Sequence, residues 1–199
     1  MKWDASQINL YITLLRNSLA VPIKTGAIYS CQMTINTINK KIFELLDENS
    51  KPAARLEYTN NAFDDAIIDA VEKYMLNGIA TGTWISHLVN DTKTRLRSKI
   101  RVETGGIISI RLLHRKKKYL FKKSAGWRLR FSLVNKEGED LLTLIPLVNW
   151  QKASHDFILQ LNEEYENECD SFLILQAVHC ANCSLSMMTG GEVPALVSI

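Results

Sequence analysis

The sequence lacks most of the features by which secreted, membrane-spanning or metal-binding proteins can be recognised. It has four cysteines in 199 residues, three of them near the C-terminus, which is too few and too uneven for the disulfide framework of a small secreted scaffold. No segment is predicted to span a bilayer, which needs about 18–20 uncharged apolar residues. The first residues, Met1-Lys2-Trp3-Asp4, contain an acid and no signal-peptide apolar region. We therefore expect a cytosolic protein with reduced thiols.

The sequence also lacks a motif that indicates catalysis. Nothing resembles a P-loop or the glycine pattern of a dinucleotide-binding fold. The one arrangement that resembles a metal site is His179-Cys180-Ala181-Asn182-Cys183, with Cys169 upstream. A structural zinc site usually has two separated ligand pairs, and only one CxxC is present, so we favour ordinary buried thiols. We expect a non-enzymatic protein with no cofactor and no metal.

What the sequence does have is a strong separation of charge. Residues 93–130 contain 14 Lys/Arg and a single acid, Glu103, a net charge of +13. The remaining residues contain 10 Lys/Arg and 20 Asp/Glu, a net charge of −10, so the overall charge of +3 hides the asymmetry. A concentration of positive charge attracts polyanions in any fold. The basic stretch is therefore an argument about partners.

Hydrophobic periodicity predicts an α+β fold, in which N-terminal helices precede a mostly antiparallel sheet of about four or five strands and a C-terminal helix. The predicted helices are residues 4–19, 27–48, 62–76, 83–99 and 151–168. The predicted strands are residues 54–58, 107–113, 117–123, 127–134, 141–148 and 170–178. Turns are expected at Gly105-Gly106 and at residues 135–140, because glycine there permits the backbone reversal.

The predicted helix 27–48 carries a continuous apolar stripe that includes Ile35, Ile38 and Ile42. We interpret this stripe as packing in the protein's own core, with a partner-binding or self-associating seam as the alternative. The chain is accordingly divided into a helical docking or oligomerisation segment (1–50), an α+β domain with a basic central sheet (51–185) and a tail (186–199).

The basic stretch divides into two parts. Lys93, Arg95, Arg97 and Lys99 fall at the predicted C-terminus of helix 83–99, where the helix dipole favours each cation by about 0.3–1 kcal/mol. The other candidates lie on predicted strands and their connections, and they have no such local explanation: Arg111, Arg115, Lys116, Lys117, Lys118, Lys122, Lys123, Arg128 and Arg130.

Three interpretations of this second part stay open. The cations could bind nucleic-acid phosphates, with Tyr119, Phe121 and Trp127 as base-stacking platforms among them, although the core is the better location for Trp127. In the second interpretation, they neutralise acidic segments of the same chain, such as residues 163–168. In the third, they bind an anionic membrane or an acidic protein.

We favour nucleic acid, DNA or RNA, without membrane contact, for an accessory subunit that also binds a protein partner or itself. The alternative is a protein–protein adaptor. A winged helix–turn–helix built from helices 62–76 and 83–99 and the Gly105-Gly106 hairpin is a weaker form of the first interpretation. Its link is long, and its cations cluster at the wrong end of the recognition helix.

Overall fold

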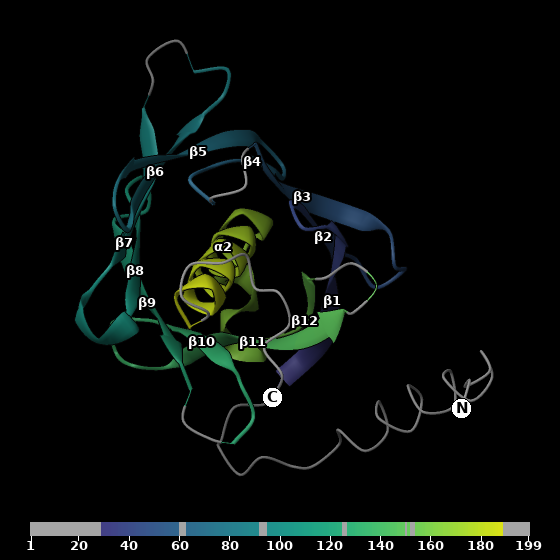
Figure 1. The fold of residues 1–199 in the computed structure, drawn as a ribbon. Coiled ribbons are helices and arrows are strands. Elements are labelled where there is room, and N and C mark those ends of the chain that lie inside the picture. Colours follow the sequence, from purple (N-terminus) through teal and green to yellow (C-terminus); the bar gives the residue numbers. More distant parts are fainter. Residues whose placement is uncertain are drawn as a thin grey trace, which may run out of the picture.

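The computed structural model describes residues 29–59, 63–91, 95–124, 127–149, 151 and 154–188, without the side chains of residues 29–32. In this part of the chain, twelve antiparallel strands close into a barrel that surrounds a single α-helix (Figure 1). The strands are β1 (Tyr29–Asn39), β2 (Ile42–Leu46), β3 (Pro52–Tyr58), β4 (Asp65–Asp69), β5 (Lys73–Ala80), β6 (Thr83–Leu88), β7 (Leu96–Val102), β8 (Ile108–Leu112), β9 (Lys117–Lys123), β10 (Phe131–Val134), β11 (Asp140–Asn149) and β12 (Ser154–Asn162). The helix is α2 (Ser171–Met188), and 3-10 turns lie at Thr104–Gly106 and Glu163–Glu168.

Each strand pairs with its neighbours in sequence, and the first strand pairs with the last. The β1–β12 ladder, which runs from Tyr29 opposite Asn162 to Ile35 opposite Phe157, closes the barrel. Closure leaves no free sheet edge, so every strand has a hydrogen-bonded neighbour on both sides.

The strands separate an apolar inner face from a polar outer face, because successive side chains point to opposite sides of a strand. On β8, Ile108, Ile110 and Leu112 are fully buried, whereas Arg111 between them is exposed. On β9, Tyr119 and Phe121 are buried and their neighbours Lys118 and Lys122 are exposed. The inner faces and α2 together form one hydrophobic core.

Helix α2 fills the centre of the barrel (Figure 1), which twelve strands leave wider than their own side chains can fill. Its residues from Phe172 to Leu185 are all buried. A helix that is largely apolar on every side is buried in a protein core or in a membrane, and here the barrel encloses it.

Two expectations about this segment are wrong. Residues 170–178 were expected to be a strand and instead form the first half of α2. We also predicted no segment long enough to span a bilayer, yet Ser171–Met188 has the length and composition for it, with a mean hydropathy of 1.3. Because 72% of that window is buried inside the barrel, and core helices meet the same criterion, α2 is accounted for as a core helix.

The predicted α+β fold, with its N-terminal helices and four or five strands, is wrong. Helix 27–48 is replaced by β1 and β2, helix 62–76 by β4 and β5, helix 83–99 by β6 and β7, and helix 151–168 by β12 and a 3-10 turn. The winged helix–turn–helix is therefore wrong too. Each of the first three pairs of short strands, joined by a turn, places apolar residues three or four apart by chance. The predicted helix 4–19 lies outside the described residues.

Several strands and turns are confirmed. Residues 117–123 form β9 as predicted, and β3, β8 and β11 lie within a few residues of the predicted strands. The turns also hold, since Gly105, Gly106 and Gly138 have φ angles of 76°, 76° and 89°, which glycine adopts without strain. The predicted strand 127–134 is shorter and begins at Phe131.

The described part of the predicted N-terminal segment, residues 29–50, lies within the barrel, because β1 pairs with β12 and β2 with β3. Residues 1–28 and 189–199 lie outside the described residues. The predicted division of the chain stays a prediction there.

Candidate functional site

The outer faces of β7, β8 and β9 carry cations that lie opposite one another. Lys99 on β7 is the register partner of Arg111 on β8, and Arg111 is in turn the partner of Lys118 on β9. Directly opposed residues have Cβ atoms about 4.5–5.5 Å apart. Three positive side chains therefore stand side by side across three strands, and all three are exposed.

Two further exposed cations extend this row along the strands. Arg101 follows Lys99 by two residues on β7, and Lys122 follows Lys118 by four on β9, so both point outward. We call Lys99, Arg101, Arg111, Lys118 and Lys122 the basic wall. The acid of the basic stretch, Glu103, accepts a hydrogen bond of 2.8 Å from the Ser109 hydroxyl at the edge of this wall.

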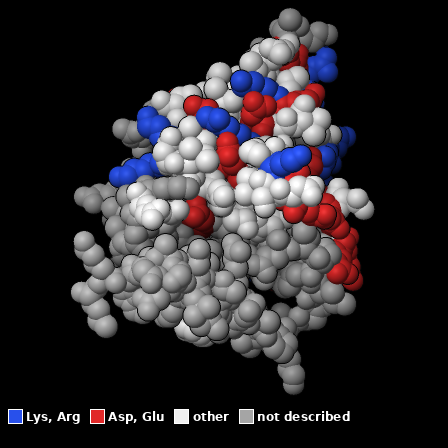
Figure 2. All heavy atoms as spheres, turned by 90° about the vertical axis from the view of Figure 1, so that its right-hand side faces the viewer, with Lys and Arg blue, Asp and Glu red and all other residues white. Residues whose placement is uncertain are grey.

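Within the described residues, no ion pair involves any member of the basic wall. The contrast with β2–β5 is direct, because the outward row there is Glu44, Arg55, Asp69 and Lys73 in register, which alternates in sign. Figure 2 shows basic and acidic residues interspersed over the described part of the face on the right of Figure 1. The fold can thus pair opposite charges across strands, and it does not do so on β7–β9.

Like charges on opposed strands destabilise the pairing by about 0.2–1 kcal/mol per pair. The Lys99–Arg111 and Arg111–Lys118 pairs both carry this cost. An anion bound across the row would remove the repulsion and replace it with charge-assisted hydrogen bonds.

Two of the predicted site residues are neutralised by the chain itself. Arg115 forms an ion pair of 2.5 Å with Asp170, and Lys117 forms one of 2.9 Å with Glu168. The Tyr119 hydroxyl also donates a hydrogen bond of 2.6 Å to Glu168. Partial burial raises the pKa of Glu168, but the bonds from Tyr119 and Lys117 outweigh it and lower that pKa overall. These contacts connect the β8–β9 turn to the segment before α2. For this part of the basic stretch they agree with the second interpretation, in which acidic segments of the same chain neutralise the cations.

The other predicted cations lie apart from the strand row. Lys116 is in the β8–β9 turn, Lys123 ends β9, and Arg128 and Arg130 belong to the connection between β9 and β10 rather than to a strand. The Arg128 guanidinium lies 4.4 Å from the centroid of the Trp127 ring.

Of the three aromatic residues considered as platforms, Tyr119 and Phe121 are in the core, and Trp127 is 83% exposed. The expectation that Trp127 is a core residue is wrong, because the strand that was to carry it begins four residues later, at Phe131. Trp127 is the one platform candidate whose ring is accessible.

Sequence reasoning missed Lys99 and Arg101. Lys99 was explained by the C-terminus of a helix that does not exist, and Arg101 was not considered. The signal was present, since Arg97, Lys99 and Arg101 recur with the period of two that is typical of a strand.

The structure does not place all three predicted partner-binding residues on one surface. Ile35 is fully buried in the barrel, whereas Ile38 is 48% exposed near the β1–β2 turn. Ile42 lies on β2 with intermediate exposure. No common apolar stripe results, because a strand turns alternate side chains to opposite faces.

The cysteine and histidine cluster in α2 is a buried hydrogen-bonded group. His179 Nδ1 lies 3.1 Å from the Tyr58 hydroxyl, and His179 Nε2 lies 3.6 Å from Cys183 Sγ. Burial lowers the pKa of His179 to about 3 and raises that of the Cys183 thiol, so both groups are neutral at physiological pH. Among the described residues, no three His, Cys, Asp or Glu side chains are placed to hold a metal ion.

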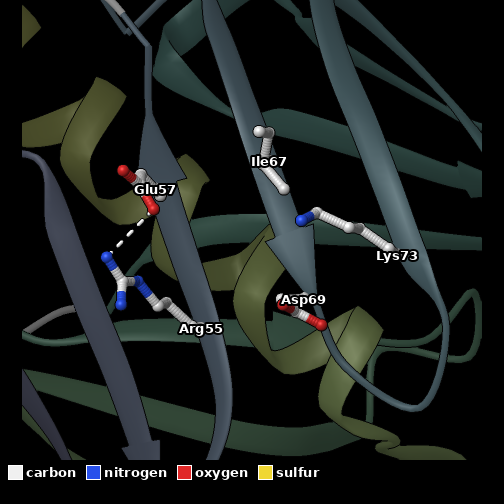
Figure 3. A pocket seen from close by; sticks show the side chains of 5 residues that line it. All are labelled: Arg55, Glu57, Ile67, Asp69 and Lys73. Carbon is white, nitrogen blue, oxygen red and sulfur yellow. Dashed lines mark ion pairs between the residues drawn. The ribbon is translucent and has the colours of Figure 1, made fainter. Parts of the chain in front are cut away.

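Two surface hollows are lined by described residues. The first, of about 150 Å³, lies on the outside of β3–β5 and is lined by Arg55, Glu57, Ile67, Asp69 and Lys73 (Figure 3). Its two bases and two acids balance, and Arg55 and Glu57 pair at 3.0 Å. The second, of about 400 Å³, lies where α2 ends, and is lined by Gly105, Gly106, Ile107, Lys122, Lys123, Phe131, Ser184, Met187 and Met188. The lining of the first hollow thus has no net charge, whereas that of the second includes Lys122 of the basic wall and Lys123 and contains no acid.

Comparisons with known proteins do not assign a function. No protein-family model and no curated protein matches the chain. A solved X-ray structure of a protein from Arabidopsis thaliana is similar, with 15% sequence identity and a TM-score of 0.43, over 76% of this chain and 93% of that one. A likeness this distant carries no argument about function.

Proposed function

We propose that this chain is a non-enzymatic, cytosolic accessory protein that binds nucleic acid, with the basic wall contacting the phosphate backbone. The observation that supports the proposal is the in-register row of Lys99, Arg111 and Lys118, which has no acid opposite it. Lysine and arginine that neutralise phosphates release condensed counterions, and this release supplies most of the sequence-independent affinity for nucleic acid.

The arrangement favours backbone contact over base reading. The cations stand on a rigid sheet at fixed spacings, and a charge pattern without shaped pockets recognises phosphates in any sequence. We accordingly expect little sequence preference.

The test is a binding measurement on matched variants. Fluorescence anisotropy of a labelled oligonucleotide would compare the wild type with Lys99→Gln/Arg111→Gln/Lys118→Gln, which lowers the net charge from +3 to 0. Each lost phosphate contact costs about eightfold at 50 mM salt for a single strand, so the triple variant should bind about 500-fold more weakly.

The control variant is Lys40→Gln/Lys51→Gln/Lys73→Gln, which makes the same change in net charge at exposed lysines in or beside the β1–β2, β2–β3 and β4–β5 turns, away from β7–β9. It should keep nearly all of the affinity. Equal losses in the two variants would mean that net charge, and not the basic wall, determines binding. Absence of oligonucleotide binding by the wild type would refute the proposal outright.

A further inference from the structure

The side chain of Trp127 is unusually exposed for a large aromatic residue. The ring is 83% exposed, although burying an aromatic side chain of this size is strongly favourable. The connection that carries it leaves the sheet after β9 and is closed at its base, where the Ser124 amide donates a hydrogen bond of 2.9 Å to the Arg130 carbonyl. The ring therefore belongs to a short excursion anchored between two paired strands.

Arg128 holds the indole in place without hiding it. Its guanidinium lies 4.4 Å from the ring centroid and so covers one face of the indole. The high exposure of the side chain leaves the opposite face accessible. An accessible aromatic face backed by a cation is the arrangement on which nucleic-acid bases stack.

The connection follows directly from the strand that supplies part of the basic wall. Lys118 and Lys122 point outward along β9, and Trp127 lies five residues beyond Lys122 in the sequence. A chain of phosphates that follows β9 would reach the connection at its end.

We propose that Trp127 is a stacking platform for one unpaired base, and that the preferred ligand of this protein is therefore single-stranded nucleic acid. This inference rests on the proposed function, because the basic wall must hold the phosphates. Bases of a duplex are already paired and stacked, so they cannot offer a face to the indole unless the duplex opens.

The test compares Trp127→Ala with Trp127→Phe on two probes, a 12-nucleotide oligothymidylate and its duplex with oligoadenylate. Base stacking on an aromatic residue is worth about 5- to 150-fold in affinity. We expect Trp127→Ala to lose that factor on the single strand and less than twofold on the duplex. Trp127→Phe should restore much of the loss, because it keeps an aromatic face.

The outcomes separate this inference from the proposed function. If Trp127→Ala weakens both probes equally, or neither, while Lys99→Gln/Arg111→Gln/Lys118→Gln still weakens binding by about 500-fold, the platform is refuted and the proposed function stands. If the wild type binds no oligonucleotide, the stacking platform and the proposed function are both refuted. Exposed tryptophan beside cations also suits a lipid headgroup region. Binding of phosphatidylserine vesicles that depends on Trp127, with no dependence on Trp127 for oligothymidylate, would overturn the inference in favour of a membrane surface.

Discussion

Arg111 should make the folded protein less stable than it would be with a neutral residue at that position. The side chain stands between Lys99 and Lys118 on adjacent strands, so it takes part in two directly opposed like-charge pairs. Each such pair costs about 0.2–1 kcal/mol. Arg111→Gln removes both, and because the side chain is exposed, no packing is lost. The free energy of unfolding should rise by about 0.4–2 kcal/mol.

Urea denaturation at 20 mM and 1 M salt measures this effect. The gain should be present in low salt and shrink in high salt, because at molar ionic strength the Debye length of about 3 Å is shorter than the separation of the charges. A chain of this length shifts its melting temperature by about 2–4 °C per kcal/mol, so thermal unfolding gives a second readout.

Lys136→Gln is the matched control. Lys136 lies in the β10–β11 turn and pairs with Glu137 at 3.3 Å on the surface. Its replacement should change stability by less than about 0.5 kcal/mol. A loss of stability in Arg111→Gln, or a gain that persists unchanged in high salt, would refute the inference that repulsion of Arg111 by Lys99 and Lys118 destabilises the folded protein.

Two further predictions concern the core. Burial lowers the pKa of His179 to about 3 from its ordinary 6.5, and burial also lowers the pKa of His155. The unfolded chain therefore binds protons that the folded protein does not. Unfolding free energy should fall as pH drops from about 6.5 toward 3, by up to about 1.4 kcal/mol per pH unit for His179. His179→Gln should flatten the slope measured by urea denaturation between pH 6.5 and 5, above the range where carboxylates titrate, and an unchanged slope would contradict this. Burial raises the pKa of Cys169 to about 12 and also raises that of Cys180, so a thiol reagent at pH 8 should label these residues only on unfolding. Rapid labelling of Cys180 in the folded protein, seen by peptide mass spectrometry, would show that α2 is not enclosed.

The sequence predicts the strands whose side-chain pattern is local. β9 alternates buried aromatics with lysines, and β11 is apolar on both faces, so both are found from periodicity alone. Closure of the barrel is not predictable in this way, because it depends on the pairing of β1 with β12, more than a hundred residues away. No local pattern encodes that contact.

Helix α2 was misread for a different reason. Its apolar side chains show no helical face, because all sides are buried. Length is the signal that distinguishes the two structures, since residues 171–188 form one uncharged run of 18 residues, whereas the longest described strand has 11. A helix without a polar face must be buried, and here the barrel lumen encloses it.

The candidate site was predicted in part. Arg111, Lys118 and Lys122 were predicted as cations on strands and their connections, and they lie on the basic wall. Arg115 and Lys117 belonged to the same predicted set and are neutralised by acids of the segment before α2, a contact that depends on the tertiary fold.

The most direct test of the central claim is the dependence of oligothymidylate affinity on salt concentration. If the five cations of the basic wall each contact a phosphate, the logarithm of the association constant should fall with the logarithm of salt concentration at a slope of about −3.5 for the wild type. In Lys99→Gln/Arg111→Gln/Lys118→Gln the slope should be about −1.4, because three contacts are lost. Equal slopes for the two proteins, or a wild-type slope near zero, would contradict the account.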